Sequence, residues 1–231
     1  MRYVVFGANG GTGRVLCQQA VDAGHDVVAV TRDAARFPLS DPRLLVAEAD
    51  VHDRAAVTRI VGGADAVLST LGVPFGRREI TVYSEGIDNI ATAMRRHGVR
   101  RVVAVSSSAA YPTRHADGGF LLNRVMQPLL TATMGRTTYR DMRAMEEFLR
   151  TSGLDWTVLR PGGLFDAPEP TAYELQEDHS DRIFTSRADL AASMLALAGD
   201  DKWVGRCVAV NTTEGAPTLL GMMRREAFSR G

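Results

Sequence analysis

The sequence predicts a single α/β domain whose core is a doubly wound parallel sheet. Strand and helix patterns alternate from the first residues, the strands are apolar along their whole length, and 231 residues suit one domain. Strands of this kind are typical of a parallel sheet that is covered by helices on both faces. Alternation of strand and helix along the chain then produces right-handed crossovers and a doubly wound sheet.

Short β-branched and apolar runs predict the strands, and apolar residues at helical spacing predict the helices. In chain order, the expected strands are residues 2–6, 26–31, 44–47, 65–69, 101–106 and 156–159. The expected helices are residues 12–23, 53–61, 80–96, 138–151 and 187–198. Ser186 is the expected N-cap of the last helix, and Asp189 suits its first turn, so this helix start is interpreted as structural. Four helices stop close to a glycine, the residue favoured after a last turn: Gly24, Gly62, Gly98 and Gly153.

Two long stretches interrupt the alternation, and both follow a strand, at the sheet edge where ligands bind in open α/β sheets. They are residues 111–135 and 165–181 of one domain that spans 1–231. Loops of this length in a compact domain tend to be functional. Within them, His115 and His179 are candidate proton donors, although a lone loop histidine is more often a surface residue. The acidic residues 174–181 are expected to form a solvated lid.

The composition favours neither a nucleic acid nor a membrane as a partner, and a small-molecule substrate is expected instead. Basic and acidic residues number 27 each, so neither a nucleic acid nor an acidic membrane is expected as a partner. Cys17 and Cys207 lack metal-ligand spacing, which predicts neither a metal site nor a disulfide framework and favours the reducing cytoplasm. The first residues have no signal-peptide pattern, and no apolar run reaches the ~18 residues of a membrane helix. The size suits a monomer or a homodimer.

The turn after the first strand carries the strongest motif in the chain. Gly7, Gly10 and Gly13 match the spacing G-x-x-G-x-x-G between a strand and a helix. The first glycine permits a tight turn, the second lets the backbone approach a pyrophosphate, and the third allows close packing of helix on strand. The helix N-terminus then offers free N–H groups and partial positive charge to phosphates. The motif predicts a dinucleotide site in a Rossmann-type fold, with contacts at Gly7, Asn9, Gly10, Gly11, Thr12 and Gly13.

The end of the second strand indicates which dinucleotide binds. NAD-preferring domains usually carry an acidic residue here, which holds the ribose 2′-hydroxyl, whereas this chain has Arg32, with Arg36 one turn on. A guanidinium suits a 2′-phosphate, because it forms paired, charge-assisted hydrogen bonds. Asp33 follows immediately and is the competing ribose acceptor, and Arg36 can also be a solvated surface charge. The sequence favours NADP(H) as the cofactor and leaves these alternatives open.

Further cofactor contacts are expected where the third and fourth strands end. Asp50 can accept a hydrogen bond from the adenine amine, and Val51 can pack on the ring. The alternative for Asp50 is a turn or N-cap residue before the helix that begins at Asp53. Leu71 and Gly72 end the fourth strand, where the chain passes beneath the dinucleotide.

These stretches resemble the atypical short-chain dehydrogenase/reductases, in the group of NAD(P)H-binding proteins that includes NmrA-like proteins. Within that group the chain looks most like the flavin reductase/biliverdin-IXβ reductase branch. The resemblance reaches about Val210 and rests on residues 7–13, 31–38, 49–51, 63–67, 84–86, 98–99, 105–107, 152–154 and 160–162. In that branch two arginines after the second strand contact the 2′-phosphate, which implies this role for Arg32 and Arg36. The matching stretch at 160–162 implies a cofactor contact at Pro161.

The chemical end of the site is expected where the fifth strand runs into Ser106, Ser107 and Ser108. In the superfamily that the chain resembles, this strand end supplies a serine or threonine whose hydroxyl polarises a substrate carbonyl. Matching to the flavin-reductase branch selects Ser107, and matching to the extended sugar-nucleotide branch selects Ser108. The alternative is that small residues here only let the backbone pass the nicotinamide.

The usual acid of the superfamily is the tyrosine of a Tyr-x-x-x-Lys motif, whose lysine lowers the pKa of the tyrosine. Tyr139 and Arg143 have that spacing, which puts them on one face of the expected helix. Lys202 is the only lysine of the chain, and an arginine is not an equivalent donor. The alternative is an aromatic residue and an arginine on a half-exposed helix. Gly163 replaces the histidine that the branch carries after its sixth strand, so a biliverdin-type site is not supported.

The sequence therefore predicts an NADPH-dependent oxidoreductase that transfers a hydride to a small carbonyl, quinone or flavin-like acceptor. One alternative is a non-catalytic NADP(H)-binding sensor or regulator, and another is an isomerase or epimerase that uses bound cofactor transiently. Tyr139 and the serines favour an enzyme, whereas the missing lysine favours the sensor.

Overall fold

The computed structural model describes residues 1–74, 76, 78–111, 135–179 and 182–217, and it confirms an α/β fold with a mostly parallel central sheet. The main sheet has the strand order β3-β2-β1-β4-β5-β6-β10-β8. All neighbouring strands are parallel except β8, which pairs antiparallel with β10. The strands are β1 (Arg2–Phe6), β2 (Asp26–Thr31), β3 (Leu44–Glu48), β4 (Ala66–Ser69), β5 (Arg101–Val105), β6 (Asp155–Pro161), β8 (Tyr173–Glu177) and β10 (Arg206–Thr212). A small second sheet pairs β7 (Gly163–Phe165) with β9 (Phe184–Ser186).

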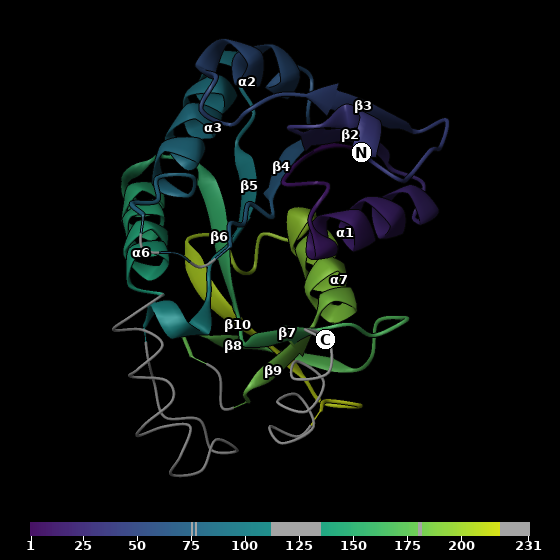
Figure 1. Cartoon of the computed structure of the whole chain (residues 1–231), viewed down its shortest axis with the longest axis vertical. Helices are drawn as coiled ribbons and strands as arrows, with labels where there is room; N and C mark the ends of the chain where they lie inside the picture. Colours follow the sequence, from purple (N-terminus) through teal and green to yellow (C-terminus); the bar gives the residue numbers. More distant parts are fainter. Residues whose placement is uncertain (75, 77, 112–134, 180–181, 218–231) are drawn as a thin grey trace.

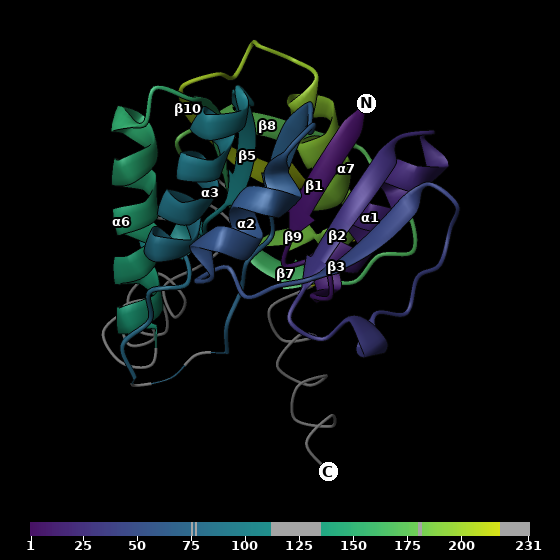
Figure 2. The same cartoon turned by 90° about the horizontal axis from the view of Figure 1, so that it is seen from above.

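Helices cover both faces of the main sheet, as Figure 1 and Figure 2 show. On one face lie α2 (Arg54–Val61), α3 (Ser84–His97) and α6 (Arg136–Thr151), and on the other lie α1 (Gly11–Asp22) and α7 (Arg187–Ala198). Alternate residues of β1 enter the two cores. Val4 and Phe6 pack in the core under α2, α3 and α6, whereas Tyr3 and Val5 pack in the core under α1 and α7. This burial on both sides is the physical reason why the strands have no polar face.

Most of the expected elements are confirmed to within a residue or two, but α3 begins at Ser84 rather than at residue 80. The cause is a contact between helices. The carboxylate of Asp141, on α6, accepts hydrogen bonds from the backbone N–H groups of Tyr83 (2.9 Å) and Ser84 (3.3 Å) and from the Ser84 hydroxyl. A cap that comes from another helix leaves no signal in the local sequence pattern.

The expected acidic lid is wrong for residues 174–177, whereas residues 180 and 181 lie outside the described part of the chain. Residues 173–177 form β8, in which Tyr173 and Leu175 pack against the core under α1 and α7 while Glu174 and Glu177 are exposed. The alternation over residues 173–175 is the pattern of a half-buried strand, and charged side chains on an edge strand discourage pairing with other chains. The sequence patterns also failed to predict β7, β9 and β10.

Within the described ranges, no helix is long and apolar enough to cross a membrane. The same ranges contain no group of three or more histidine, cysteine, aspartate or glutamate side chains that could hold a metal ion. Cys17 and Cys207 are free and buried, and burial raises the pKa of each thiol to about 12.

Candidate functional site

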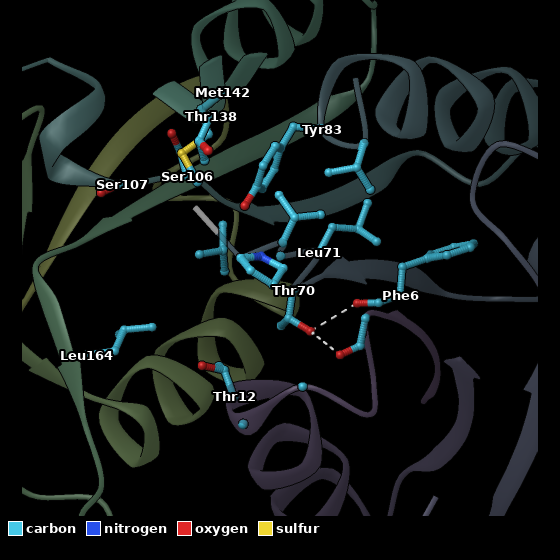
Figure 3. Close-up of a pocket in the computed structure, with 18 of the residues that line it drawn as sticks. Phe6, Thr12, Thr70, Leu71, Tyr83, Ser106, Ser107, Thr138, Met142 and Leu164 are labelled. Atoms are coloured by element: carbon cyan, nitrogen blue, oxygen red, sulfur yellow. Dashed lines mark hydrogen bonds between the residues drawn. The ribbon is translucent and has the colours of Figure 1, made fainter. Parts of the chain in front are cut away.

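A cavity of about 1370 Å³ runs along the carboxyl edge of the main sheet. Many of the residues that line it lie at or just after the ends of β1, β2, β3, β4, β5 and β6. The edge includes the point between β1 and β4 where the strand order reverses, which is where open α/β sheets bind ligands. Figure 3 shows part of this cavity, which is the candidate functional site.

The glycine turn between β1 and α1 leaves no room for side chains. Gly7 has a φ of 76°, and a Cβ atom there would stand 2.6 Å from the carbonyl oxygen of Thr70. A Cβ atom on Gly13 would run into the carbonyl oxygen of Gly7 and stand 2.8 Å from the Cα atom of Ala8. The Thr70 hydroxyl donates to the carbonyl oxygens of Phe6 (3.0 Å) and Gly7 (3.2 Å), as Figure 3 shows. The turn is therefore shaped by backbone contacts that only glycine permits.

The first turn of α1 presents backbone N–H groups to the cavity. Gly10 is the N-cap residue, and no side chain caps this helix end. Gly10, Gly11 and Thr12 line the cavity, and the first N–H groups of any α-helix lack partners within the helix. Asn9 helps to hold the loop, because its Oδ1 atom accepts a hydrogen bond from the Arg14 guanidinium at 2.9 Å. A diphosphate group fits this cradle of free N–H groups and partial positive charge.

At the β2 end of the cavity, the Asp33 carboxylate is already engaged. Its Oδ1 atom accepts from the backbone N–H of Arg36 at 3.3 Å, which caps a short 3-10 helix, η1 (Ala34–Arg36). Its Oδ2 atom lies 3.2 Å from Nε of Arg36, whose side chain is 84% exposed. Arg32, Asp33 and Arg36 all line the cavity. Arg32 and Arg36 thus bring two guanidinium groups to this place, and the Arg36 guanidinium pairs with the competing carboxylate of Asp33.

Asp50 is a turn residue, whereas Asp53 is the N-cap of α2, with its carboxylate accepting from the N–H groups of Ala55 and Ala56 at 3.0 Å. The Asp50 carboxylate accepts from the backbone N–H of His52 at 2.9 Å and lies 2.8 Å from its Nδ1 atom. The backbone hydrogen bond from His52 is the main cause that lowers the pKa of Asp50. Val51 is buried beside Asp50, and both line the cavity.

Most of the predicted site residues lie together along this cavity. Leu71 and Gly72 line it after β4, and Pro161 lines it at the end of β6. Of the seventeen predicted residues, Gly13 and Arg143 are not in the lining. Gly13 is buried behind the turn, where its role is close packing rather than contact with a ligand.

The three serines after β5 have different surroundings. Ser107 is the N-cap of η2 (Ser108–Ala110), and its Oγ atom accepts from the backbone N–H of Ala109 at 3.2 Å. Ser108 begins that short helix, and all three serines line the cavity. The hydroxyl of Ser106, which sequence reasoning did not select, is buried and has no hydrogen-bond partner among the described residues. An unpaired buried hydroxyl costs free energy unless a ligand or water completes it.

The first turns of α6 bring a second unpaired hydroxyl to the cavity. Thr138 is buried, its Oγ1 atom has no partner in the part of the chain that the structure describes, and sequence reasoning also missed it. Met142 follows one helical turn later, and Figure 3 labels Ser106, Thr138 and Met142 at the same end of the cavity. No sequence signal singles out Ser106 or Thr138, because their lack of partners depends on how β5 and α6 pack.

Tyr139 lines the cavity, whereas Arg143, one helical turn further along α6, is not in the lining. The Arg143 guanidinium donates to the carbonyl oxygen of Ala110 at 2.8 Å and so holds the end of η2. Burial raises the pKa of Tyr139, which is the opposite of the shift that a lysine cation produces in the usual motif. Tyr139 at neutral pH is therefore a neutral phenol.

Tyr83 and Arg187 also line the cavity, and sequence reasoning selected neither. Figure 3 shows the Tyr83 ring reaching toward the centre of the cavity, and burial is the main cause that raises its pKa to about 12. Arg187 is the first residue of α7, whose cap is the Ser186 hydroxyl, as expected. His179 is exposed and is not in the lining, and His115 lies outside the described residues.

Comparisons with known proteins agree with this geometry. A family model described as NAD(P)H-binding matches residues 7–201 of the chain. An uncharacterised chloroplastic protein of Arabidopsis thaliana is 31% identical over 183 residues, which is 75% of this chain and 62% of that protein. A uronate dehydrogenase of Pseudomonas syringae is 34% identical over 177 residues, which is 73% of this chain and 61% of that protein. The chain therefore spans about three fifths of the length of these two relatives.

Among solved structures, a short-chain dehydrogenase/reductase from Veillonella parvula in complex with NADP has a similar fold. Its TM-score is 0.75 at 18% sequence identity, and the match covers 92% of this chain and 95% of that one. At this level of identity the likeness shows the fold alone. The finer resemblance to the flavin reductase/biliverdin-IXβ reductase branch stays a prediction.

Proposed function

Because the chain belongs to the NAD(P)H-binding family, we propose that it is an NADPH-dependent reductase of a small carbonyl, quinone or flavin-like acceptor. The observation that carries the proposal is the make-up of one continuous cavity. Arg32 and Arg36 lie at one end, the glycine turn follows, and the unpartnered hydroxyls of Ser106 and Thr138 lie at the other end. The uronate dehydrogenase relative supports redox chemistry as the reaction class.

The β2 end of the cavity supports NADP(H) rather than NAD(H). A ribose 2′-hydroxyl needs an acceptor there, and both oxygens of the Asp33 carboxylate already contact Arg36, which partly neutralises its charge. A 2′-phosphate needs cations, and Arg32 and Arg36 line the cavity at this place. The Veillonella neighbour, which is crystallised with NADP, supports the same choice.

The other end of the cavity supports an acceptor that has a neutral, hydrogen-bond-accepting oxygen. The hydroxyls of Ser106 and Thr138 each have a proton to donate, and an acceptor oxygen between them would satisfy both. Met142 is an apolar neighbour at this end of the cavity, and hydrogen bonds are stronger in apolar surroundings than in water. NADPH, when bound, supplies the hydride, and the chain's own part is to orient the acceptor and polarise its oxygen.

The residues chosen from the sequence have supporting roles in this proposal. Ser107 uses its oxygen to cap η2, yet its O–H proton stays available to an acceptor, and Ser108 lies beside it. Tyr139, as a neutral phenol in the cavity wall, can donate a proton to the reduced oxygen. Arg143 is a positioning residue, because it fixes η2 through Ala110.

The proposal is tested by following NADPH absorbance with the purified chain and a panel of quinones, flavins and small carbonyl compounds. Steady oxidation of NADPH with one class of acceptor supports a reductase. Tight NADPH binding without turnover on any acceptor would move the assignment to a sensor. Conversion of a sugar-like substrate without net oxidation of cofactor would move it to an isomerase or epimerase.

We expect Arg32→Asp to weaken NADPH binding about tenfold or more, ~1.4 kcal/mol, and to leave NADH binding nearly unchanged. The reason is that only NADPH carries the 2′-phosphate that the guanidinium would pair with. Binding is measured by fluorescence titration with each cofactor. Arg96→Asp is the control, because Arg96 is exposed in the last turn of α3 and does not line the cavity. Equal losses for NADPH and NADH would contradict the cofactor assignment.

We expect Thr138→Val and Ser106→Ala each to lower kcat/KM for the acceptor about 10²-fold while NADPH affinity and thermal stability stay the same. A buried hydroxyl without a partner costs free energy in the folded state, so its removal should not lower the thermal stability. Activity and unfolding are measured on the same preparations.

Thr157→Val is the matched control for these variants. The Thr157 hydroxyl is also buried, but it donates to the carbonyl oxygen of Trp203 at 2.8 Å and accepts from Arg101 at 2.8 Å. Its removal should lower stability and leave the activity of the folded fraction intact. A stability loss in Thr138→Val, or unchanged kcat/KM in both variants, would show that the unpaired hydroxyls do not meet the acceptor.

A further inference from the structure

Arg187 lies across the N-terminus of α1, at the glycine turn. A Cβ atom on Gly11 would stand 2.8 Å from Nε and 3.1 Å from Cδ of Arg187. The side chain is 27% exposed and lines the cavity. Gly11 is thus in contact with an arginine side chain from the far end of the sequence. The absence of a side chain at Gly11 therefore makes room for Arg187, in addition to the cofactor contact that the sequence motif predicts for Gly11.

The start of α7 is fixed by buried hydrogen bonds, which holds Arg187 in place. The Ser186 hydroxyl caps the helix by accepting from the N–H of Asp189 at 2.9 Å. The Asp189 carboxylate accepts from the N–H of Thr171 at 2.6 Å and from the hydroxyl of Thr212 at 2.5 Å. Gln19 of α1 donates to the carbonyl oxygen of Ala188 at 3.1 Å, which ties the two helices together. The guanidinium is therefore presented to the turn by a pre-formed support.

Without Arg187, the positive charge at the glycine turn would be too small to balance the negative charge of a bound diphosphate. Among the described residues that line the cavity, the arginines are Arg32, Arg36 and Arg187, and the first two follow β2. The diphosphate of a dinucleotide carries two negative charges, whereas the N-terminus of α1 offers only about half a positive charge. A guanidinium adds charge-assisted, directional hydrogen bonds to phosphate oxygens.

The Arg187 guanidinium already forms an ion pair with the carboxylate of Asp166. Its Oδ1 atom lies 2.8 Å from Nη1 of Arg187, and its own side chain is 88% exposed. Asp166 directly follows β7, whose residues Gly163 and Leu164 line the cavity. An ion pair with such an exposed carboxylate contributes little to stability, so a dianionic group can displace it at small cost.

We propose that Arg187 binds the diphosphate of the nicotinamide dinucleotide and that Asp166 is an internal anion which competes for the same guanidinium. When the cofactor enters, its diphosphate replaces Asp166 as the partner of Arg187, and Asp166, which follows β7, is released. Cofactor binding is thereby linked to the segment that forms the acceptor side of the cavity. This inference rests on the proposed function, because it takes the cavity as a dinucleotide site.

The test titrates the full chain with NADPH, with NADH and with adenosine 2′-monophosphate, which has the 2′-phosphate but no diphosphate. Arg187→Gln should weaken NADPH and NADH by the same factor, about tenfold or more, and leave adenosine 2′-monophosphate unchanged. Asp166→Asn should strengthen both dinucleotides a few-fold. The double variant should bind like Arg187→Gln alone, because Asp166 acts only through that guanidinium.

Arg206→Gln is the matched control, since Arg206 forms an equally close exposed pair with Glu177, at 2.7 Å, and does not line the cavity. Dinucleotide affinities that stay unchanged in Arg187→Gln, or that fall in Asp166→Asn, would overturn the inference while the proposed function stands. A wild-type chain that binds neither dinucleotide would overturn the proposed function itself. If Arg187→Gln does not fold, Asp166→Asn and Arg187→Lys carry the test, and Arg187→Lys should lose less affinity than Arg187→Gln.

Discussion

Glu146→Gln should lower the free energy of unfolding by about 3–5 kcal/mol, because the buried guanidinium of Arg160 then keeps only the exposed carboxylate of Asp178, at 3.7 Å, as a counter-charge. Glu146 is fully buried on α6, and its Oε2 atom lies 2.5 Å from Nη2 of Arg160, whose side chain is 7% exposed. Burial alone would lower the pKa of Arg160, but the hydrogen bond to Glu146, the negative charge of Glu146 and the smaller effects of Cys207 and Tyr111 together outweigh burial and raise the pKa. The loss is measured by urea unfolding followed by circular dichroism.

Glu147→Gln is the control for this variant. Glu147 is the next residue of α6, its side chain is 74% exposed, and it pairs with Arg150 at 3.5 Å. Such an exposed pair contributes about 0–1 kcal/mol, so its loss should be hard to detect. The prediction is contradicted if the two variants lose the same stability. Replacing both Glu146 and Arg160 by Met should recover part of the loss, because a buried pair can be exchanged for apolar packing.

The Glu146–Arg160 pair also supports the candidate site. Arg160, at the end of β6, donates to the carbonyl oxygen of Asp178 at 3.0 Å, and its guanidinium stacks 4.4 Å from the centre of the Tyr111 ring. Tyr111 follows η2, and Asp178 follows β8. One buried ion pair therefore anchors the two segments that the sequence indicates as the substrate side of the cavity.

Gly13→Ala should weaken NADPH binding at least about a hundredfold, ~2.7 kcal/mol, because the new Cβ atom collides with the turn that holds the diphosphate. The collision is with the carbonyl oxygen of Gly7 and with the Cα atom of Ala8, which would lie only 2.8 Å away. Neither is the end of a flexible side chain, so α1 and the turn must separate. Affinity is measured by fluorescence titration of NADPH.

Helix propensity alone would make Gly13→Ala stabilising, so a loss of NADPH affinity can be attributed to the collision. Alanine is about 1 kcal/mol more favourable than glycine inside a helix, so a variant without a collision would be stabilised. Gly199→Ala is the control, because Gly199 ends α7 at a negative φ and nothing lies within 4 Å of a Cβ atom there. NADPH affinity within threefold of the wild type in Gly13→Ala would show that the turn tolerates a side chain.

The cofactor half of the site is largely predictable because its signals are local. The glycine spacing, the adjoining strand and helix, and Arg32 after β2 all lie within a short stretch of chain. A Cβ atom on Gly13 would collide with its near neighbours Gly7 and Ala8, whereas one on Gly7 would collide with Thr70 and Leu71, which are distant in the sequence. The acceptor half has no such local code. The spacing of Tyr139 and Arg143 brings Tyr139 to the cavity, whereas Arg143 donates to the carbonyl oxygen of Ala110 and is not in the lining.

By itself, the sequence determined the alternation of strands and helices, the glycine turn and the class of cofactor, because each depends on periodicity or on residues that are neighbours in the chain. The tertiary structure decided which side chains face the cavity. The hydroxyls of Ser106 and Thr138 have no partners among the described residues. Arg187 packs on Gly11 and pairs with Asp166. Residues 173–177 form an edge strand of the main sheet. The physical reason is that burial and hydrogen-bond pairing are fixed by which segments pack together, and those segments lie far apart in the sequence.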